Sequence, residues 1–281
     1  MALGPAIGRL FSHVDYWPGW SRLTPPLARV PTTEELRGFA AAQRLAIRCA
    51  QETEKQLRTG ITERELAAWM RDWLASHGVE HYFHRPFVWF GPRTRFRHFT
   101  TRLDLRATEQ RLAENDVYIF DFAPVLEGYA CDFSYAGQWG TVPGYAEARA
   151  VLDRLYRDIP GWVAASGHRA DRLWQRVHQE LTAHSLSGVH ETSSYSFLGH
   201  RIHHVAASPL ARALAQRGAQ TLLEFFARGA SGQVLTRHHQ GDMTGLWAVE
   251  PHLAFGDHAV KFEELLLVTP AGATWLRDAA V

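Results

Sequence analysis

A strand–turn–strand segment carries two aspartates at positions where a sheet normally buries apolar side chains. The segment runs from Val117 to Ala123, passes through a turn near Gly128, and continues from Ala130 to Ser134. β-Branched and aromatic residues on both sides of a glycine-containing turn are typical of a β-hairpin. We therefore predict a hairpin that contains Asp121 and Asp132.

The turn of this hairpin decides how the two aspartates face each other. A turn at Leu126-Glu127 places them directly opposite, whereas a turn at Glu127-Gly128 makes them diagonal neighbours. Since side chains alternate along a strand, both registers put the carboxylates on one face, roughly 5 to 8 Å apart. Like charges so placed destabilise a sheet unless a cation or a shared proton lies between them. The hairpin predicts a metal site, and alternation directs Cys131 into the core on the opposite face.

Length and composition restrict the class of protein. The 281 residues suit one large domain or two small ones, and 46% apolar with 21% charged residues is typical of a soluble globular protein. A formal charge of +1 gives no basic field for nucleic acid. Two cysteines, no signal sequence and no apolar run of membrane-spanning length predict a cytoplasmic protein without a membrane partner.

The order of predicted elements indicates an α+β protein made of two similar halves. The first helix starts at Thr32 or Thr33, continues to about Arg58, and has Gln43 as the one polar residue in its apolar stripe. Further helices are predicted over 63–77, 145–165, 170–183 and 210–228, and strands over 80–91, 115–123, 130–138 and from Trp247 onwards. Residues 1–31 are predicted to form an irregular arm and 32–281 the body, with an insertion near 205–242.

Three more residues are candidate metal ligands because each stands at the end of an apolar stretch. They are His200 after Phe197-Leu198-Gly199, Glu250 before Pro251, and Glu263 before the apolar run 265–268. Carboxylate and imidazole groups are the ligands that hard and borderline divalent cations prefer.

Each candidate also has a structural alternative. The aspartates can be satisfied by backbone amides or arginine, His200 can be a core or surface residue, and Glu250 can pair with Arg237. Glu263 can be solvated beside Glu264, with Lys261 as a surface partner. The cluster Arg93-Arg95-Arg97 marks either an anionic substrate group or a solvated basic edge.

Taken together, these motifs resemble the pita-bread metallopeptidases, the superfamily of methionine aminopeptidase, aminopeptidase P and prolidase. The shared order is Asp, a second Asp eleven residues later, Gly-His, Glu-Pro, and Phe-Glu before Val-Thr-x-x-Gly. The resemblance covers roughly residues 34–276 and includes the Gly60–Leu66 helix opening. It implies a pita-bread α+β fold with two pseudo-symmetric halves around a curved antiparallel sheet.

The resemblance also implies a role for each candidate. Asp121 would chelate one metal, Asp132 and Glu263 would bridge two metals, and His200 with Glu250 would complete the other. The ions would be two divalent metals, with Mn, Fe, Co and Zn all compatible. Glu250 would also carry a proton to the leaving nitrogen, His98 would contact substrate, and His204 would stabilise the tetrahedral intermediate.

The sequence departs from the family after His200. The family usually has Gly-His-Gly-Ile-Gly, whereas this chain reads Gly199-His200-Arg201-Ile202-His203-His204. We expect a reshaped pocket in which Arg201 and His203 contact substrate, and His203 competes with His204 for the second histidine role.

The predicted activity is dinuclear metal-dependent hydrolysis of an amide bond by a metal-activated water. The substrate would be a small peptide or amino-acid derivative, as for an aminopeptidase or Xaa-Pro peptidase, and the expected assembly is a homodimer. The alternatives are an oxidative, iron-dependent enzyme on the same scaffold and a non-catalytic binding module.

Overall fold

A computed structural model of the protein describes residues 29–192, 197–204, 234–237, 239 and 241–279. Residues 1–28 of the predicted arm, the predicted helix 210–228 and most of the predicted insertion lie outside the described residues. Among the helices that are described, none is both long and apolar enough to cross a lipid bilayer.

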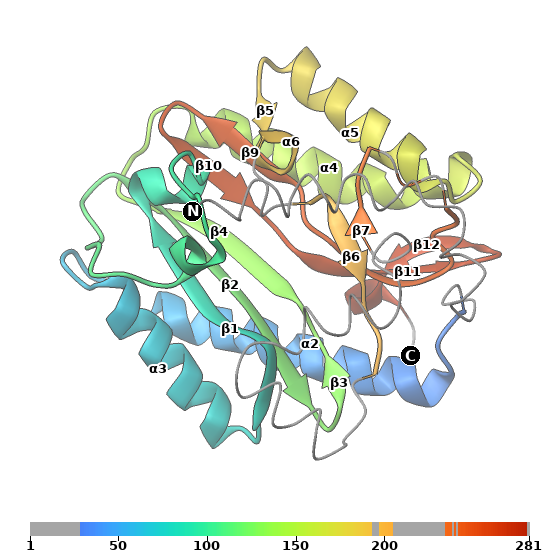
Figure 1. Ribbon diagram of the computed structural model, residues 1–281, viewed down its shortest axis with the longest axis horizontal. Coiled ribbons are helices and arrows are strands. Elements are labelled where there is room, and N and C mark those ends of the chain that lie inside the picture. Colours follow the sequence, from blue (N-terminus) through green and yellow to red (C-terminus); the bar gives the residue numbers. More distant parts are fainter. Residues whose placement is uncertain (1–28, 193–196, 205–233, 238, 240, 280–281) are drawn as a thin grey trace.

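The first half of the chain forms two helices and an antiparallel sheet (Figure 1). Helices α2 (Thr33–Glu54) and α3 (Glu63–Ser76) precede strand β1 (His81–Phe90) and two 3₁₀ helices, η2 (Gly91–Arg95) and η3 (Arg102–Leu105). Strands β2 (Asp116–Leu126), β3 (Tyr129–Ala130) and β4 (Phe133–Trp139) follow. Strand β2 pairs with β1, β3 and β4, and all three pairings are antiparallel.

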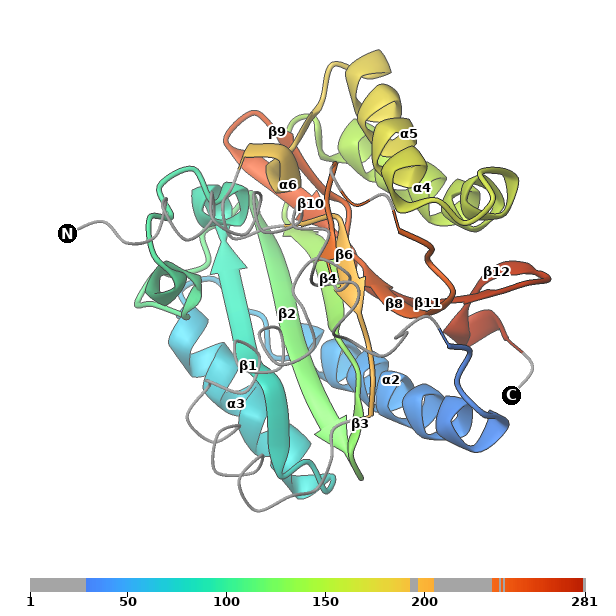
Figure 2. The same cartoon turned by 45° about the vertical axis from the view of Figure 1, so that its right-hand side comes forward.

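The second half repeats the plan of two helices followed by strands. It contains α4 (Tyr145–Ala165), α5 (Ala170–Ala183), β5 (Ser187–Gly188) and α6 (Val189–Thr192). Its remaining strands are β6 (Gly199–Arg201), β7 (Val234–Leu235), β8 (Gly245–Val249), β9 (His252–Phe255), β10 (His258–Lys261), β11 (Glu264–Thr269) and β12 (Gly272–Trp275), and the 3₁₀ helix η5 (Leu276–Asp278) follows. They form two antiparallel sheets, ordered β12-β11-β8-β6-β7 and β10-β9-β5. In Figures 1 and 2 the pair α2–α3 and the pair α4–α5 lie on opposite sides of the central strands.

Both helices of the first half begin at a capping box. The hydroxyls of Thr32 and Thr62 accept the backbone N–H of Glu35 and Glu65, whose carboxylates accept the threonine N–H in return. The predicted starts are therefore confirmed. The first helix ends at Glu54, four residues before its predicted end, because the chain after it continues in i→i+3 turns.

Alternation along the strands divides their side chains between two apolar clusters. Tyr118, Phe120 and Phe122 of β2 join the cluster that contains the buried residues of α2 and α3, whereas Val117 and Ile119 join the cluster that contains those of α4 and α5. Every residue of β2 except Leu126 is buried, so both faces of this strand are covered. Asp121 follows the parity of Val117 and Ile119.

The observed hairpin selects one of the two predicted registers. Val125 pairs with Ala130 and Leu126 with Tyr129, so the turn is Glu127-Gly128, and both turn residues have positive φ. In this register Asp121 lies opposite Ser134, which makes Asp132 its diagonal neighbour. Cys131 is fully buried in the α2–α3 cluster, as alternation predicted.

Backbone hydrogen bonds join the two halves beside this hairpin. Ser134 N–H donates to Glu263 O at 3.2 Å and Glu263 N–H donates to Ser134 O at 3.1 Å. We call this pair the seam. It places the residue before β11 against the second strand of the hairpin.

Candidate metal centre

Five sequence-predicted ligands reach one buried region from five separate places in the chain. Asp121 lies within β2, Asp132 just before β4, His200 in β6, Glu250 just after β8, and Glu263 just before β11. Their exposed fractions lie between 2% and 7%, so all five are buried polar groups that need partners.

His200 is directed at two of the carboxylates. Its Nε2 lies 3.1 Å from Asp132 Oδ2 and 3.5 Å from Glu263 Oε1. Its Nδ1 faces the backbone carbonyl of Arg201 at 3.2 Å, and Phe83 stacks on the ring at 5.4 Å. With the Nδ1 proton donated to that carbonyl, Nε2 presents its lone pair to the site, which is the usual arrangement of a histidine ligand.

A second histidine, His84 of β1, approaches the hairpin aspartates. Its Nε2 lies 3.0 Å from Asp132 Oδ1 and 3.3 Å from Asp121 Oδ1. The sequence prediction missed this residue. Its strand was predicted, but the register between β1 and β2 shifts on both sides of His84. Pro86, which lacks an N–H, stands within the second shift, and such a bulge cannot be counted from sequence alternation.

Lys261 lies among the carboxylates. Its Nζ is 2.5 Å from Asp121 Oδ2, 2.7 Å from Glu250 Oε2 and 3.0 Å from Glu263 Oε2, and the residue is 4% exposed. The alternative in which Lys261 is a surface partner of a solvated Glu263 is therefore wrong, since Lys261, Glu263 and Glu264 are all buried.

Burial and close charges shift the pKa values of these groups in opposite directions. Burial raises the pKa of Asp121 to about 6 and that of Glu250 to about 8. For Asp132, burial also raises the pKa, but His84 and His200 outweigh it and hold the value far below the ordinary range. Burial lowers the pKa of His84, but Asp132 and Asp121 outweigh it and raise the value to about 9.

The donor atoms form two groups in which three ligand atoms lie within 4.8 Å of one another. One group is His84, Asp121 and Asp132, and the other is Asp132, His200 and Glu263. Donors that share a metal at about 2.0–2.2 Å lie roughly 3 to 3.5 Å from one another, and the histidine–carboxylate distances of 3.0 to 3.5 Å match this. These residues fit divalent ions. Glu250 belongs to neither group.

The structure does not bring the other predicted site residues to the carboxylates. His98 is exposed, and within the described ranges no hydrogen bond or ion pair joins it to this cluster. His204 is exposed and contacts the Tyr129 ring at 4.7 Å, while His203 is half-buried. The guanidinium of Arg201 donates to the carbonyls of Thr244 and Asp242 and lies over the Trp247 ring. Roles for these residues toward substrate stay predictions.

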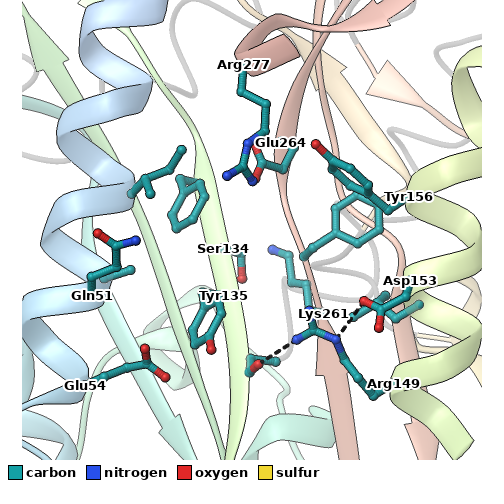
Figure 3. A pocket seen from close by; sticks show the side chains of 16 residues that line it. Gln51, Glu54, Ser134, Tyr135, Arg149, Asp153, Tyr156, Lys261, Glu264 and Arg277 are labelled. Carbon is teal, nitrogen blue, oxygen red and sulfur yellow. Dashed lines mark hydrogen bonds and ion pairs between the residues drawn. The ribbon is translucent and has the colours of Figure 1, made fainter.

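A pocket of about 260 Å³ lies between α2 and α4, where Glu54, Arg149, Asp153 and Glu264 line it (Figure 3). It meets the candidate centre through Lys261, which also lines it, and includes none of the five predicted ligands. The candidate metal ligands therefore lie outside the lining of this pocket.

The three arginines of the basic cluster have partners within the fold. Arg93 Nε donates to the buried carboxylate of Glu63, Arg97 pairs with Asp257 at 3.1 Å, and Arg95 donates to the carbonyl of Gly256. They tie η2 and the following residues to α3 and to the turn between β9 and β10.

Comparisons with known proteins agree with this architecture. A protein-family model described as Metallopeptidase family M24 matches residues 37–270. The fold is similar to that of the X-Pro aminopeptidase from Thermotoga maritima MSB8, with 18% identity, a TM-score of 0.68, and 90% of this chain and 63% of that chain covered. It is also similar to the prolidase from Pyrococcus furiosus, with 16% identity, a TM-score of 0.66, and 91% and 67% covered.

The dipeptidase PepE from Mycobacterium ulcerans is a third similar structure, with 18% identity, a TM-score of 0.67, and 90% of this chain and 60% of that chain covered. No curated protein matches the chain. The chain thus spans 63% of the first of these structures, and the likeness confirms the predicted pita-bread α+β fold.

Proposed function

Because the chain belongs to metallopeptidase family M24, we propose that it is a metal-dependent hydrolase that cleaves an amide bond in a small peptide or amino-acid derivative. The observation that carries the proposal is the position of Asp132. Its two oxygens face two different imidazoles, 3.0 Å from His84 Nε2 and 3.1 Å from His200 Nε2. A buried carboxylate whose two oxygens face different imidazoles supports a bridging role between two ions.

Divalent ions held there would supply a nucleophile from water at neutral pH and polarise the scissile carbonyl. The chain's own residues would position the reactants and move the proton. Glu250 lies outside both donor groups, Lys261 Nζ positions its Oε2 at 2.7 Å, and burial raises the pKa of Glu250 to about 8, so its carboxyl group is suited to carry a proton to the leaving nitrogen.

For the substrate, we propose dipeptides with proline in the second position, or peptides cleaved at their first residue. The similar structures are named as an X-Pro aminopeptidase, a prolidase and a dipeptidase. His98 and His204 keep their predicted roles of contacting substrate and stabilising the tetrahedral intermediate, and Arg201 and His203 keep theirs of lining the pocket.

The test is an activity screen with a matched inactive variant. Protein stripped of metal and reloaded with Mn²⁺, Fe²⁺, Co²⁺ or Zn²⁺ is incubated with Xaa-Pro dipeptides, Met-Ala-x peptides and amino-acid amides, and the release of free amine is measured. We expect hydrolysis with at least one metal and a loss of at least 10³-fold in Asp132→Asn, since this exchange removes the bridging charge but keeps the shape.

A control variant separates this effect from general damage. Asp153→Asn changes an exposed aspartate that pairs with Arg149, so activity should stay within twofold. Metal-loaded protein that hydrolyses none of these substrates but consumes oxygen with Fe²⁺ would replace the proposal with the oxidative alternative. Protein that binds no metal would favour the non-catalytic module.

We also propose a compartment for the protein. Cys49 and Cys131 are both free and buried, which supports the proposal of a reducing, cytoplasmic compartment. A homodimer stays a prediction, and light scattering of the purified protein would decide it.

A further inference from the structure

We infer that His84 is a metal ligand equivalent to His200, so that each of the two ions is held by one imidazole. The ligand set implied by the family resemblance contains one histidine, His200. This inference rests on the proposed function, because it assumes that the carboxylate cluster binds metal.

His84 and His200 have the same kinds of contact partners. Each Nε2 faces one oxygen of Asp132, at 3.0 Å for His84 and 3.1 Å for His200. Each also faces a second carboxylate, Asp121 at 3.3 Å for His84 and Glu263 at 3.5 Å for His200. Each ring therefore faces one oxygen of Asp132 and one oxygen of a second carboxylate.

The outer side of each ring is fixed in the same way. His84 Nδ1 faces the carbonyl of Arg85 at 3.0 Å, and His200 Nδ1 faces the carbonyl of Arg201 at 3.2 Å. In both cases the partner belongs to the next residue and selects the tautomer whose Nε2 lone pair points at the carboxylates. A phenylalanine of β1 stacks on each ring, Phe87 on His84 at 4.8 Å and Phe83 on His200 at 5.4 Å.

The carboxylate oxygens divide into three sets that do not overlap. Asp121 Oδ1 and Asp132 Oδ1 face His84, while Asp132 Oδ2 and Glu263 Oε1 face His200. The remaining oxygens, Asp121 Oδ2 and Glu263 Oε2, face Lys261 together with Glu250 Oε2. Lys261 thus holds Glu250, which the family resemblance assigns to the ion of His200, while His84 adds a donor to the ion of Asp121.

Such a centre favours a particular class of metal. Two imidazoles and carboxylates that include one bridge suit Mn²⁺, Fe²⁺, Co²⁺ and Zn²⁺ better than Mg²⁺ or Ca²⁺, which prefer oxygen ligands alone. Asp132 is the carboxylate that would bridge the two ions, since Glu263 directs one oxygen at the His200 group and the other at Lys261.

The experiment counts metal ions in four proteins. Wild type, His84→Ala, His200→Ala and the control His178→Ala, at an exposed site of α5, are stripped of metal and titrated with Co²⁺, and the bound ions are quantified by calorimetry and elemental analysis. We expect two Co²⁺ per chain in wild type and His178→Ala, and at least tenfold weaker binding of one ion in both His84→Ala and His200→Ala. Binding of both ions by His84→Ala with affinities within twofold of wild type would overturn the inference.

A measurement on the wild-type protein covers the case in which His84→Ala does not fold. Histidine ¹⁵N spectra of Zn²⁺-loaded protein should show two metal-bound Nε2 signals, and a single one would overturn the inference. Failure of the proposed function looks different: wild type that binds two ions through both histidines without hydrolysis would remove the function alone. Hydrolysis with a single metal-bound histidine would remove this inference alone.

Discussion

At the residue scale, the metal-free cluster depends on the charge of one side chain. Lys261 Nζ contacts three carboxylates at 2.5 to 3.0 Å while 4% of the residue is exposed. Removing one partner of a buried ion pair costs about 3–5 kcal/mol because the remaining charge stays buried without compensation. We expect Lys261→Met to lower the free energy of unfolding of the metal-free protein by about this amount, as measured by urea unfolding.

A surface lysine provides the comparison. Lys55 pairs with Glu52 at 2.6 Å, but both side chains are well exposed, and exposed pairs contribute about 0–1 kcal/mol. If Lys261→Met unfolds at the same urea concentration as Lys55→Met, then the three contacts of Lys261 do not stabilise the fold.

His190 is a second residue whose burial has a measurable consequence. Burial disfavours its imidazolium form and lowers the pKa of His190 to about 4. In the unfolded chain the pKa is near its ordinary value of about 6.5, so the unfolded state takes up the proton first as the pH falls. The free energy of unfolding should therefore decrease between pH 6.5 and pH 4, by about 3 kcal/mol from this residue.

Replacing the imidazole tests this contribution. Between pH 6.5 and pH 4, the free energy of unfolding of His190→Phe should fall by about 3 kcal/mol less than that of the wild type. The fall in His98→Phe, which changes an exposed site, should equal that of the wild type. Thermal unfolding followed by circular dichroism across this pH range gives the comparison. Parallel curves for wild type and His190→Phe would mean that His190 is not buried in its neutral form.

At the scale of elements, a buried carboxylate fastens α3 to the strands. Glu63 is fully buried, and its oxygens accept hydrogen bonds from Phe90 N, from Arg93 Nε, and from the N–H and hydroxyl of Thr108. In Glu63→Gln an amide NH₂ group would face donors that need an acceptor. We expect this exchange to cost about 3 kcal/mol of unfolding free energy in urea titrations.

Glu65, two residues later, is the matched control. Its carboxylate completes the capping box of the same helix but lies at the surface, so Glu65→Gln should have a much smaller effect. Equal losses in the two variants would show that the cap, and not the buried network, fixes the position of α3.

How far the sequence predicts the elements depends on how local each signal is. The hairpin, the capping box at Thr62 and the bounds of α4 and α5 follow from neighbouring residues, and all appear in the structure, whereas the choice between the two predicted turns is made only by the observed register. Gln43 stood out as polar in an apolar stripe, but its partner Glu264 is 221 positions away and is visible only in the folded chain.

Signals that depend on distant packing were missed or misread. His84 reaches Asp132 across a strand pair whose register shifts twice, so alternation counted from the sequence misplaces it. Lys261 reads as a surface residue because lysine is usually exposed, yet three carboxylates from separate segments surround it. Asp121 and Asp132 were predicted as ligands from alternation in the hairpin, and His200, Glu250 and Glu263 from their places at the ends of apolar stretches; the family resemblance then linked the five.

At the scale of the whole molecule, the candidate centre and the seam hold the two halves together. His84, Asp121 and Asp132 come from the first half, whereas His200, Glu250, Lys261 and Glu263 come from the second. The Ser134–Glu263 backbone pair lies beside them. Metal bound at this place would therefore act as a further cross-link between the halves, which also meet through apolar packing, the seam and polar contacts such as Gln43–Glu264 and Arg97–Asp257.

Metal binding should for this reason raise the stability of the whole chain. A ligand that binds only the folded state at 100 times its dissociation constant adds about 2.7 kcal/mol. For a chain of this size this corresponds to roughly 5 °C in melting temperature. We expect Mn²⁺ or Co²⁺ to produce such a rise in calorimetry, and to slow amide hydrogen exchange at Ser134 and Glu263 more than exchange at the exposed start of α2.

The variant Asp132→Asn separates this cross-link from general effects of added ions. Because Asp132 faces both histidines, its loss should abolish both the rise in melting temperature and the slowed exchange at the seam. An equal rise in the variant would place the stabilising ion elsewhere. A rise in wild type without slower exchange at Ser134 and Glu263 would mean that metal stabilises one half alone, since a bridge between the halves must protect the hydrogen bonds that join them.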